Sequence, residues 1–530
     1  MKPRVILFGL DGATYDVLDD LMGRGLMPNL EKFYGEGVRA KMLSTVPPLT
    51  PLAWSSLVTG RSPGNHGVLG FLQYADSKSE QITVVSSRNF TAETVWSIAN
   101  RQGMRAGSLN FVAHQPAPKI DGWVVPGWVS WRWMKRLSHP ADIIERLKRD
   151  IPEFDVKSLA LDFDEEKKAV AGAPLDDYGA WIDLHLKREQ QWFDVLNHLQ
   201  ETDPVDLLGI VFDGVDKLQH LLWPYLDPAL APAEPTAEFV EIRKMAWEYF
   251  RLIDRLLGQT VALYGDESTI LICSDHGFAG SWEVLYINTW LANQGYLTWA
   301  PEAQQVEEGC QELQGAYHDR QGFIWEQTKA YAITPSSNGI YINVKGKRRD
   351  SGVAPEDYDS LRKELIHKLL TECVDPATGQ PLVERVYTRE EAYAGKHINN
   401  APDLTLALRD KGFVSVRRTN AYLAPRPAVI GTHHPDGILI ARGPGIRKGG
   451  WVDRVTLMDV TPTALFAMGL EIPEDLEGRV LEELYTPEYV AARGPKLGAA
   501  TAEAEAVVVT GAQDEDAQIL EKMKALGYLE

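Results

Sequence analysis

Short apolar runs alternate along this chain with longer stretches that have the spacing of amphipathic helices. The runs at residues 5–8, 206–212 and 268–274 are rich in β-branched and aliphatic side chains. Such runs are typical of parallel strands that are buried on both faces. Further strands are expected at residues 106–111, 404–408 and 437–441. Alternation of strands with helices predicts an α/β fold with a mostly parallel central sheet flanked by helices.

The same patterns divide the chain into a core and two insertions. Helices are expected at residues 91–101, 237–257 and 455–468. The core is predicted to span residues 1–480, with a helical insertion at 127–204 and a mixed α+β insertion at 282–400. Residues 481–530 are expected to form a linker and a C-terminal docking helix, because much of this stretch is rich in Ala, Gly and Glu.

Composition and charge narrow the class of partner. The chain has 530 residues and a formal net charge of −20, which argues against a nucleic acid polymer as partner. A small phosphate ester is still compatible, since bound metal ions reverse the local field. The three cysteines are odd in number and widely spaced, which fits a reducing compartment and predicts a cytoplasmic location. No run approaches the roughly 18 apolar residues of a transmembrane helix. The sequence does not indicate the oligomeric state.

Six side chains of the types that bind metals lie in four short patches of the chain. Three patches stand at or just beyond the end of a predicted strand, where open α/β sheets form their ligand crevice. The six are Asp11, Asp216, His220, Asp275, His276 and His433.

Each patch also has an ordinary explanation. Asp216 and His220 share one helix face, a spacing that usually means a solvated pair, and Asp213 ranks lower as a ligand because no histidine follows at that spacing. Histidines in a loop such as that of His433 are common. Asp275 and His276, directly after a buried strand, are harder to explain by packing. The combination therefore favours a metal site.

Thr50 precedes Pro51 at the predicted start of a helix that ends before Gly60. A threonine at this position commonly only caps the helix. A hydroxyl at a helix N-terminus also lies where backbone N–H groups and the helix dipole favour a phosphate. Metal coordination activates a hydroxyl as a nucleophile, so Thr50 is a candidate for both roles.

These motifs, in this order, are similar to those of a known family. The stretches are Gly9-Leu10-Asp11-Gly12, Thr50 with Thr59-Gly60, Pro63 and His66-Gly67, Asp216-x-x-x-His220, Ser274-Asp275-His276-Gly277 and Gly431-x-His433. The chain resembles the alkaline phosphatase superfamily, specifically the type I phosphodiesterase/nucleotide pyrophosphatase branch and its prokaryotic phosphohydrolase or phosphomutase group. The resemblance covers most of residues 1–480 and is more specific for fold and metal site than for substrate.

The resemblance implies two zinc ions per chain, with manganese or iron as alternatives. One ion would be held by Asp216, His220 and His433. The other would be held by Asp11, Asp275, His276 and the oxygen of Thr50. Imidazole and carboxylate ligands suit zinc. The implied reaction is attack of Thr50 on phosphorus, followed by hydrolysis of a phospho-threonine intermediate.

Substrate contacts are less defined. Phe71 stands where nucleotide pyrophosphatases place an asparagine that contacts a phosphoryl oxygen, and Asn110 or an arginine is a candidate to replace that contact. Trp128 and Trp131 belong to an aromatic cluster with Trp123 and Trp133, which either packs the helical insertion on the core or forms a lip for the substrate.

The sequence therefore predicts a hydrolase that acts on a small phosphate ester, of the phosphodiesterase or pyrophosphatase type. One rival is a phosphomonoesterase or phosphomutase with the same metals. The other rival is a metal-binding scaffold that recognises a phosphorylated ligand without turnover. Because all seven expected site positions are filled, the scaffold is the weaker alternative.

Overall fold

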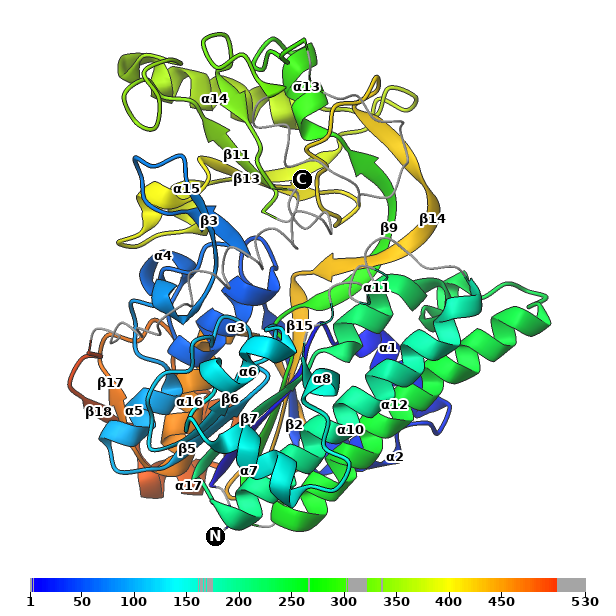
Figure 1. Ribbon diagram of the computed structural model, residues 1–530, viewed down its shortest axis with the longest axis vertical. Coiled ribbons are helices and arrows are strands. Elements are labelled where there is room, and N and C mark those ends of the chain that lie inside the picture. The colour runs from blue at the N-terminus through cyan, green and yellow to red at the C-terminus, as the bar shows by residue number, and fades with distance from the viewer. Residues whose placement is uncertain are drawn as a thin grey trace.

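The computed structural model (Figure 1) describes residues 4–160, 175–265, 267–301, 322–334 and 337–502, with isolated positions 2, 162, 165, 168 and 303. The expected C-terminal docking helix lies outside the described residues. None of the described helices is both long and apolar enough to cross a lipid bilayer.

The core contains an eight-stranded sheet with the strand order β16-β2-β15-β8-β1-β7-β5-β6. Only β15 runs antiparallel to its neighbours, β2 and β8; the other pairs are parallel. The predicted α/β class with a mostly parallel sheet is thus confirmed. The strands are β1 (Val5–Leu10), β2 (Val38–Leu43), β5 (Ala106–Leu109), β6 (Gly122–Val125), β7 (Leu207–Phe212), β8 (Thr269–Cys273), β15 (Asp436–Arg442) and β16 (Trp451–Thr456).

Helices cover both faces of this sheet, so β1 is buried along its whole length (Figure 1). Ile6 and Phe8 join one apolar cluster, and the alternate residues Val5 and Leu7 join the other. The first face carries α1 (Tyr15–Gly23), α2 (Pro28–Glu36), α10 (Tyr178–Thr202), α11 (Gly214–Leu226) and α12 (Ala237–Tyr264). The second carries α3 (Thr50–Thr59), α5 (Val95–Arg101) and α16 (Val460–Met468).

The helical segment expected at 127–204 packs against the first face of the sheet. It contains α6 (Trp131–Leu137), α7 (Ile143–Asp150), α8 (Val156–Leu159) and α10. Met134, Leu147 and Trp192 from these helices join the same apolar cluster as Phe212 of β7. Burial of such side chains stabilises the segment against the core by roughly 1.5–3 kcal/mol for each large apolar group.

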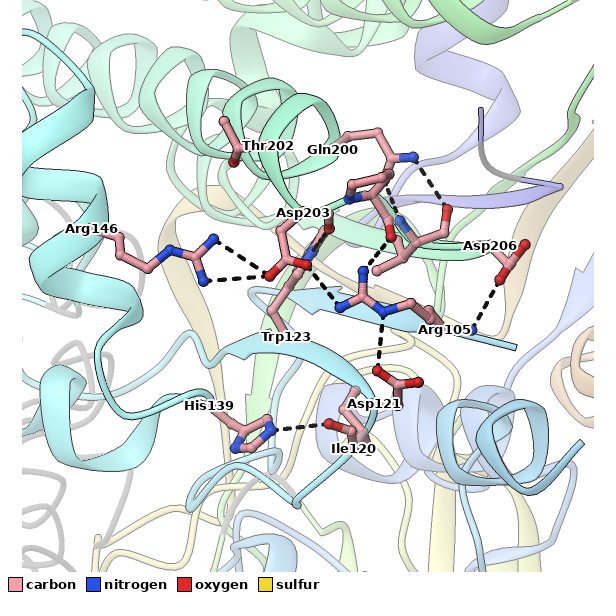
Figure 2. A network of polar contacts seen from close by, with 12 residues as sticks. Arg105, Ile120, Asp121, Trp123, His139, Arg146, Gln200, Thr202, Asp203 and Asp206 are labelled. Atoms are coloured by element: carbon pink, nitrogen blue, oxygen red, sulfur yellow. Dashed lines mark hydrogen bonds and ion pairs between the residues drawn. The ribbon is translucent and has the colours of Figure 1, made fainter. Parts of the chain in front are cut away.

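Arg105 shows how this segment is fixed at the end of the sheet opposite the strands' carboxyl ends (Figure 2). Its guanidinium donates to Asp121 Oδ1 (3.0 Å), Asp203 Oδ1 (2.8 Å) and the carbonyl of Pro204 (2.6 Å). The indole of Trp123 donates to the carbonyl of Asp203 over 3.0 Å. Trp123 therefore packs inside the fold and does not contribute to a substrate lip.

A second unit, here called the cap, comprises residues 277–434 and stands beyond the carboxyl end of β8 (Figure 1). The antiparallel ribbon β9 (Gly277–Leu285) and β14 (Leu423–His434) connects it to the core. Its own sheet has the order β10-β11-β13-β12, with strands Ala330–Tyr331, Gly339–Ile342, Leu404–Leu408 and Val383–Thr388. Its helices are α13 (Ile287–Asn293), α14 (Tyr358–Thr371) and α15 (Arg389–Ala392).

A hairpin of the core reaches into the cap. Strands β3 (Leu72–Tyr74) and β4 (Ile82–Val84) form it, following the short helix α4 (Pro63–His66). Tyr74 packs edge-on against Tyr341 of β11, with 5.3 Å between ring centroids. Leu49 and Leu52, which flank Thr50 in the sequence, belong to the same apolar cluster as these two tyrosines. The start of α3 is therefore packed directly against the core–cap junction.

Residues 481–498 are folded, which corrects the expectation of a linker from residue 481. Leu481, Leu484 and Tyr485 are buried, and Tyr485 packs edge-on against Phe466 of α16. Helix α17 (Pro487–Arg493) follows, and β18 (Lys496–Gly498) pairs in parallel with β17 (Glu471–Pro473). The spacing of Leu481, Leu484 and Tyr485 in the sequence was a sign of folded structure. The small and charged residues farther along the chain obscured this sign.

Candidate metal centre

The fold places the six metal-type side chains at one edge of the central sheet. Asp11 directly follows β1, Asp216 lies in the first turn of α11 after β7, and Asp275 follows β8. Strands β8, β1 and β7 are neighbours in the sheet, so their carboxyl ends lie side by side. His433 arrives from the end of β14, and Thr50 is the first residue of α3.

One group of side chains converges around Asp216. Its Oδ1 atom lies 3.2 Å from His433 Nε2 and 3.5 Å from His220 Nε2. The two imidazole Nε2 atoms are themselves only 3.1 Å apart. Because both nitrogens face the same point, a cation between them would remove the repulsion between their lone pairs.

A second group converges around His276. Its Nε2 atom lies 3.2 Å from Asp275 Oδ2 and 3.6 Å from Asp11 Oδ1. The hydroxyl oxygen of Thr50 lies 3.4 Å from the same nitrogen. Asp216 Oδ1 is only 3.8 Å from it, so the two groups adjoin. This spacing fits two ions at neighbouring positions.

The other ring nitrogen of each histidine is held by a backbone carbonyl. Nδ1 of His220 bonds to Gly431 O (2.9 Å), and Nδ1 of His433 bonds to Pro48 O (2.8 Å). Nδ1 of His276 bonds to Gly277 O (3.1 Å). A carbonyl only accepts, so each Nδ1 carries the proton and each Nε2 presents a lone pair to the centre. This is the arrangement by which proteins orient histidine ligands.

In Asp11 and Asp275, likewise, one carboxylate oxygen is held by a hydrogen bond and the other faces the centre. Trp54 Nε1 donates to Asp11 Oδ2, and the backbone N–H of Gly12 donates to Asp275 Oδ1. Both hydrogen bonds are 3.1 Å long. The remaining oxygens, Asp11 Oδ1, Asp275 Oδ2 and Asp216 Oδ1, are buried and accept no hydrogen bond from the described residues. Buried oxygens without a donor are costly unless a cation satisfies them. The residues present therefore fit a metal centre, and its nitrogen and oxygen donors suit zinc.

Burial and mutual repulsion change the charges of the protein without metal. Burial, followed by repulsion from Asp275 and Asp216, raises the pKa of Asp11 well above its ordinary value. Burial raises the pKa of Asp275 to about 7. Burial also lowers the pKa of His276 well below its ordinary value, so its ring stays neutral and can bind a metal.

Removing the metals is expected to destabilise the protein more at pH 8 than at pH 5. The folded, metal-free protein holds the proton of Asp275 with a pKa of about 7, against about 3.8 for an unperturbed aspartate. That proton stabilises the folded state fully below about pH 4, and the contribution is lost as the pH rises through 7. The difference in thermal unfolding midpoint between metal-loaded and chelated protein should therefore grow from pH 5 to pH 8.

Differential scanning calorimetry at both pH values measures this difference. The chelated Asp275→Asn variant serves as control, because an amide has no proton to lose in this range and should flatten the pH dependence. An equal effect of chelation at both pH values in the wild type would contradict the coupling between metal and carboxylate.

The four expected substrate contacts lie in different surroundings. Asn110 is buried at the end of β5, where its amide donates to Val211 O (2.8 Å) and Asp213 Oδ1 (3.3 Å), so it supports the fold. Phe71 and Trp128 pack on each other with 5.5 Å between ring centroids. Trp131 is 44% exposed, and the ammonium group of Lys157 lies 5.2 Å from its ring centroid. Phe71 and Trp128 are in ring contact, and the Asn110 side chain lies against Gly127, which directly precedes Trp128.

Three supporting residues were not identified from the sequence. Trp54 lies one turn after Thr50 and orients Asp11, which the four-residue spacing could have indicated. Lys217 is buried beside Asp213 (2.7 Å) and lies 5.6 Å from the ring centroid of Trp128. Glu189 accepts from the N–H of Gly214 at the start of α11 over 2.8 Å. No local pattern marks Glu189, because its partner is on another helix.

Comparison with known proteins was consistent with this geometry. A family model described as type I phosphodiesterase/nucleotide pyrophosphatase matches residues 5–436. No curated protein sequence matches the chain. Murine ectonucleotide pyrophosphatase/phosphodiesterase 5, as an inactive threonine-to-alanine variant in complex with AMP, superposes with a TM-score of 0.50 and 14% identity, covering 92% of this chain and 100% of that chain.

Two further structures have TM-scores just below this. The human form of the same protein gives 0.49 at 14% identity, covering 91% of this chain and 100% of its own. Phosphonoacetate hydrolase from Sinorhizobium meliloti 1021, in complex with phosphonoformate, gives 0.48 at 16% identity, covering 88% and 96%. Since the family model spans most of the residues that form the core, the cap and the metal-type cluster, the chain belongs to the type I phosphodiesterase/nucleotide pyrophosphatase family of phosphoester- and pyrophosphate-cleaving hydrolases.

Proposed function

We propose that this protein is a cytoplasmic two-zinc phosphodiesterase or pyrophosphatase that cleaves a small phosphate ester through a phospho-threonine intermediate on Thr50. The observation that carries the proposal is the position of the Thr50 hydroxyl, 3.4 Å from His276 Nε2 at the edge of the ligand cluster. A structural cap would not need to face three buried carboxylates and three converging imidazoles.

The surroundings of Thr50 suit a nucleophile. Thr50 begins α3, whose dipole and free N–H groups favour negative charge on the threonine oxygen and on the phosphoryl group. Thr50 is buried, which keeps bulk water away from the reacting atoms. The murine neighbour with a threonine-to-alanine change is described as inactive, which supports a threonine role in this fold.

The proposed reaction has two displacements at phosphorus. The Thr50 oxygen forms a bond to phosphorus as the bond to the leaving alcohol breaks, and the hydroxyl proton ends on that alcohol. Water then attacks the phospho-threonine, which releases the phosphate product and restores the hydroxyl. Bound zinc would supply Lewis acidity that lowers the pKa of the hydroxyl and stabilises charge on the oxygens. Asp11, Asp275 and His276 would hold the zinc ion beside Thr50.

We favour a diester over a monoester because the matching family is described as type I phosphodiesterase/nucleotide pyrophosphatase. A monoester carries more negative charge on its phosphoryl oxygens than a diester, so it needs additional donors. By its spacing from His66-Gly67, Phe71 falls where nucleotide pyrophosphatases have an asparagine, and it packs on Trp128 in the apolar cluster that includes Leu49 and Leu52. An aromatic ring offers no such donor, so a phosphomonoesterase or phosphomutase would need to supply it from another residue.

The test combines metal analysis with two model substrates. We expect two zinc ions per chain by mass spectrometry and a higher kcat/KM on bis-nitrophenyl phosphate than on nitrophenyl phosphate. Activity should disappear on chelation and return with zinc. A much higher kcat/KM on the monoester would instead support the phosphomonoesterase reading, and bound metal without turnover of either ester would support the binding-protein reading.

The cytoplasmic location is part of the proposal. Cys273 and Cys373 are buried free thiols, which suits a reducing compartment. Fractionation of the native host with an antibody to this chain would test it, and recovery from a secreted fraction would contradict it.

A further inference from the structure

The loop after β11 concentrates positive charge in a chain whose net charge is −20. Its cations are Lys345, Lys347, Arg348 and Arg349. Lys345 is exposed, whereas the other three are half-buried. The loop lies in the cap, and its contacts place it at the junction with the core.

Arg348 bridges the two units through aromatic rings. The centre of its guanidinium lies 3.9 Å from the ring centroid of Tyr74, on the hairpin of the core, and 5.7 Å from that of Tyr341, in the cap. Both rings are buried. The guanidinium is thus fixed in place by stacking, which leaves its N–H groups to be satisfied in the plane of the group.

The neighbouring cations already have carboxylate partners. Arg349 pairs with Glu80, Arg389 with Asp403, and Arg362 with Glu390. Lys347 and Arg348 form no ion pair with any residue that the structure describes. Moreover, Nε and Nη2 of Arg348 and Nε of Arg389 are buried and have no hydrogen-bond acceptor among the described residues. Lys347 and Arg348 thus have no carboxylate partner in the described part of the chain.

Unsatisfied buried guanidinium donors are costly, which favours an acceptor at these N–H groups beyond those that the described residues provide. Burial, and then repulsion from Arg389 and Arg348, lowers the pKa of Lys347 to about 7. The positive charges of Arg348 and Arg389 thus act on Lys347. A ligand with two negative charges would balance Lys347 and Arg348 together.

We infer that Lys347 and Arg348, supported by Arg389, bind a phosphate-type dianion at the junction between core and cap. The planar guanidinium fork matches phosphate oxygens, and lysine adds a point charge. The anion is either a second phosphate group of the substrate or free inorganic phosphate that regulates the enzyme. The first of these deepens the proposed function and rests on it, whereas anion binding itself does not.

Calorimetric titration of the metal-loaded full chain with inorganic phosphate tests the site directly. We expect the wild type to show a binding event in addition to that of the metal centre, and Arg348→Gln and Lys347→Gln each to weaken it about tenfold or more. Lys345→Gln is the matched control, because it removes the same charge from the exposed part of the same loop.

Two further measurements keep the result interpretable. Arg348→Lys keeps the charge but not the fork and should weaken binding less than Arg348→Gln. Thermal unfolding and zinc content should match the wild type in Lys347→Gln, which leaves the stacked guanidinium in place. Phosphate binding by both glutamine variants that equals the Lys345→Gln control would overturn the inference.

Kinetics then separate the two sources of the anion. If the site holds a second phosphate of the substrate, Arg348→Gln should raise KM about tenfold for a diesterified pyrophosphate and leave KM for bis-nitrophenyl phosphate unchanged. If the site holds free phosphate, neither KM changes, and the effect of added phosphate on turnover is lost. Phosphate binding that depends on Arg348 in a protein without any turnover would refute the proposed function while supporting the anion site.

Discussion

Replacing Thr50 with alanine is expected to lower kcat on a phosphodiester by about 10³-fold or more while both metal ions remain bound. Loss of a nucleophile removes the covalent route altogether, which in other enzymes costs at least this much. Metal should be retained because the threonine oxygen is only one of the seven proposed ligands, and the three histidines and three carboxylates stay in place. Steady-state kinetics with metal analysis of the same sample measure both effects.

The control for this variant is Thr59→Ala on the same helix. Thr59 is also buried, but its hydroxyl donates to the carbonyl of Ser55 over 2.7 Å, at the far end of α3. Its loss should cost stability without reducing kcat by a comparable factor. Unchanged turnover in Thr50→Ala with normal zinc content would show that the nucleophile has been assigned wrongly.

The Asp275→Asn variant is expected to lose at least one metal ion per chain, and with it nearly all activity. Asp275 is fully buried, and its Oδ2 atom faces His276 across 3.2 Å. An amide keeps the shape but removes the negative charge and one strong ligand oxygen. Changing a residue that only supports metal ligands costs about 10–100-fold in affinity, so removal of a direct ligand should exceed that.

Asp436→Asn is the matched control for the loss of a carboxylate. Asp436 begins β15 and pairs with Lys41 over 3.1 Å, so its charge is used outside the ligand cluster. Zinc titration monitored by mass spectrometry should show two ions in the control and fewer in Asp275→Asn. Two ions per chain in both variants would require a new ligand set.

The buried strands were the most predictable part of the fold. The runs at 5–8, 206–212 and 268–274 correspond to β1, β7 and β8, because strands buried on both faces need uninterrupted apolar residues. In contrast, β2 was not predicted, although the alternation of Arg39 and Lys41 with its buried residues is typical of a strand with one buried face. The run at 437–441 forms β15, but its direction could not be predicted, because composition carries no information on strand polarity.

The metal-type residues could be singled out for a similar reason. Asp11, Asp275 and His276 follow strands, Asp216 and His220 lie on the helix after a strand, and His433 precedes a strand. The local pattern therefore points to one edge of the sheet, even though Asp11 and His433 lie far apart in sequence. The residues that hold them could not be found in that way. Trp54, Glu189 and the carbonyl of Pro48 act across elements, and their roles depend on tertiary packing that no local spacing encodes.

The place of β15 in the sheet sets the order in which the chain can fold during synthesis. It pairs with both β2 and β8, so the edges of those two strands stay open until Asp436–Arg442 has been made. At typical rates of elongation, roughly 20–80 s separate the synthesis of β2 from that of β15. During this time the nascent chain exposes strand edges that favour aggregation. Its production is therefore expected to depend on chaperones that bind unfinished chains.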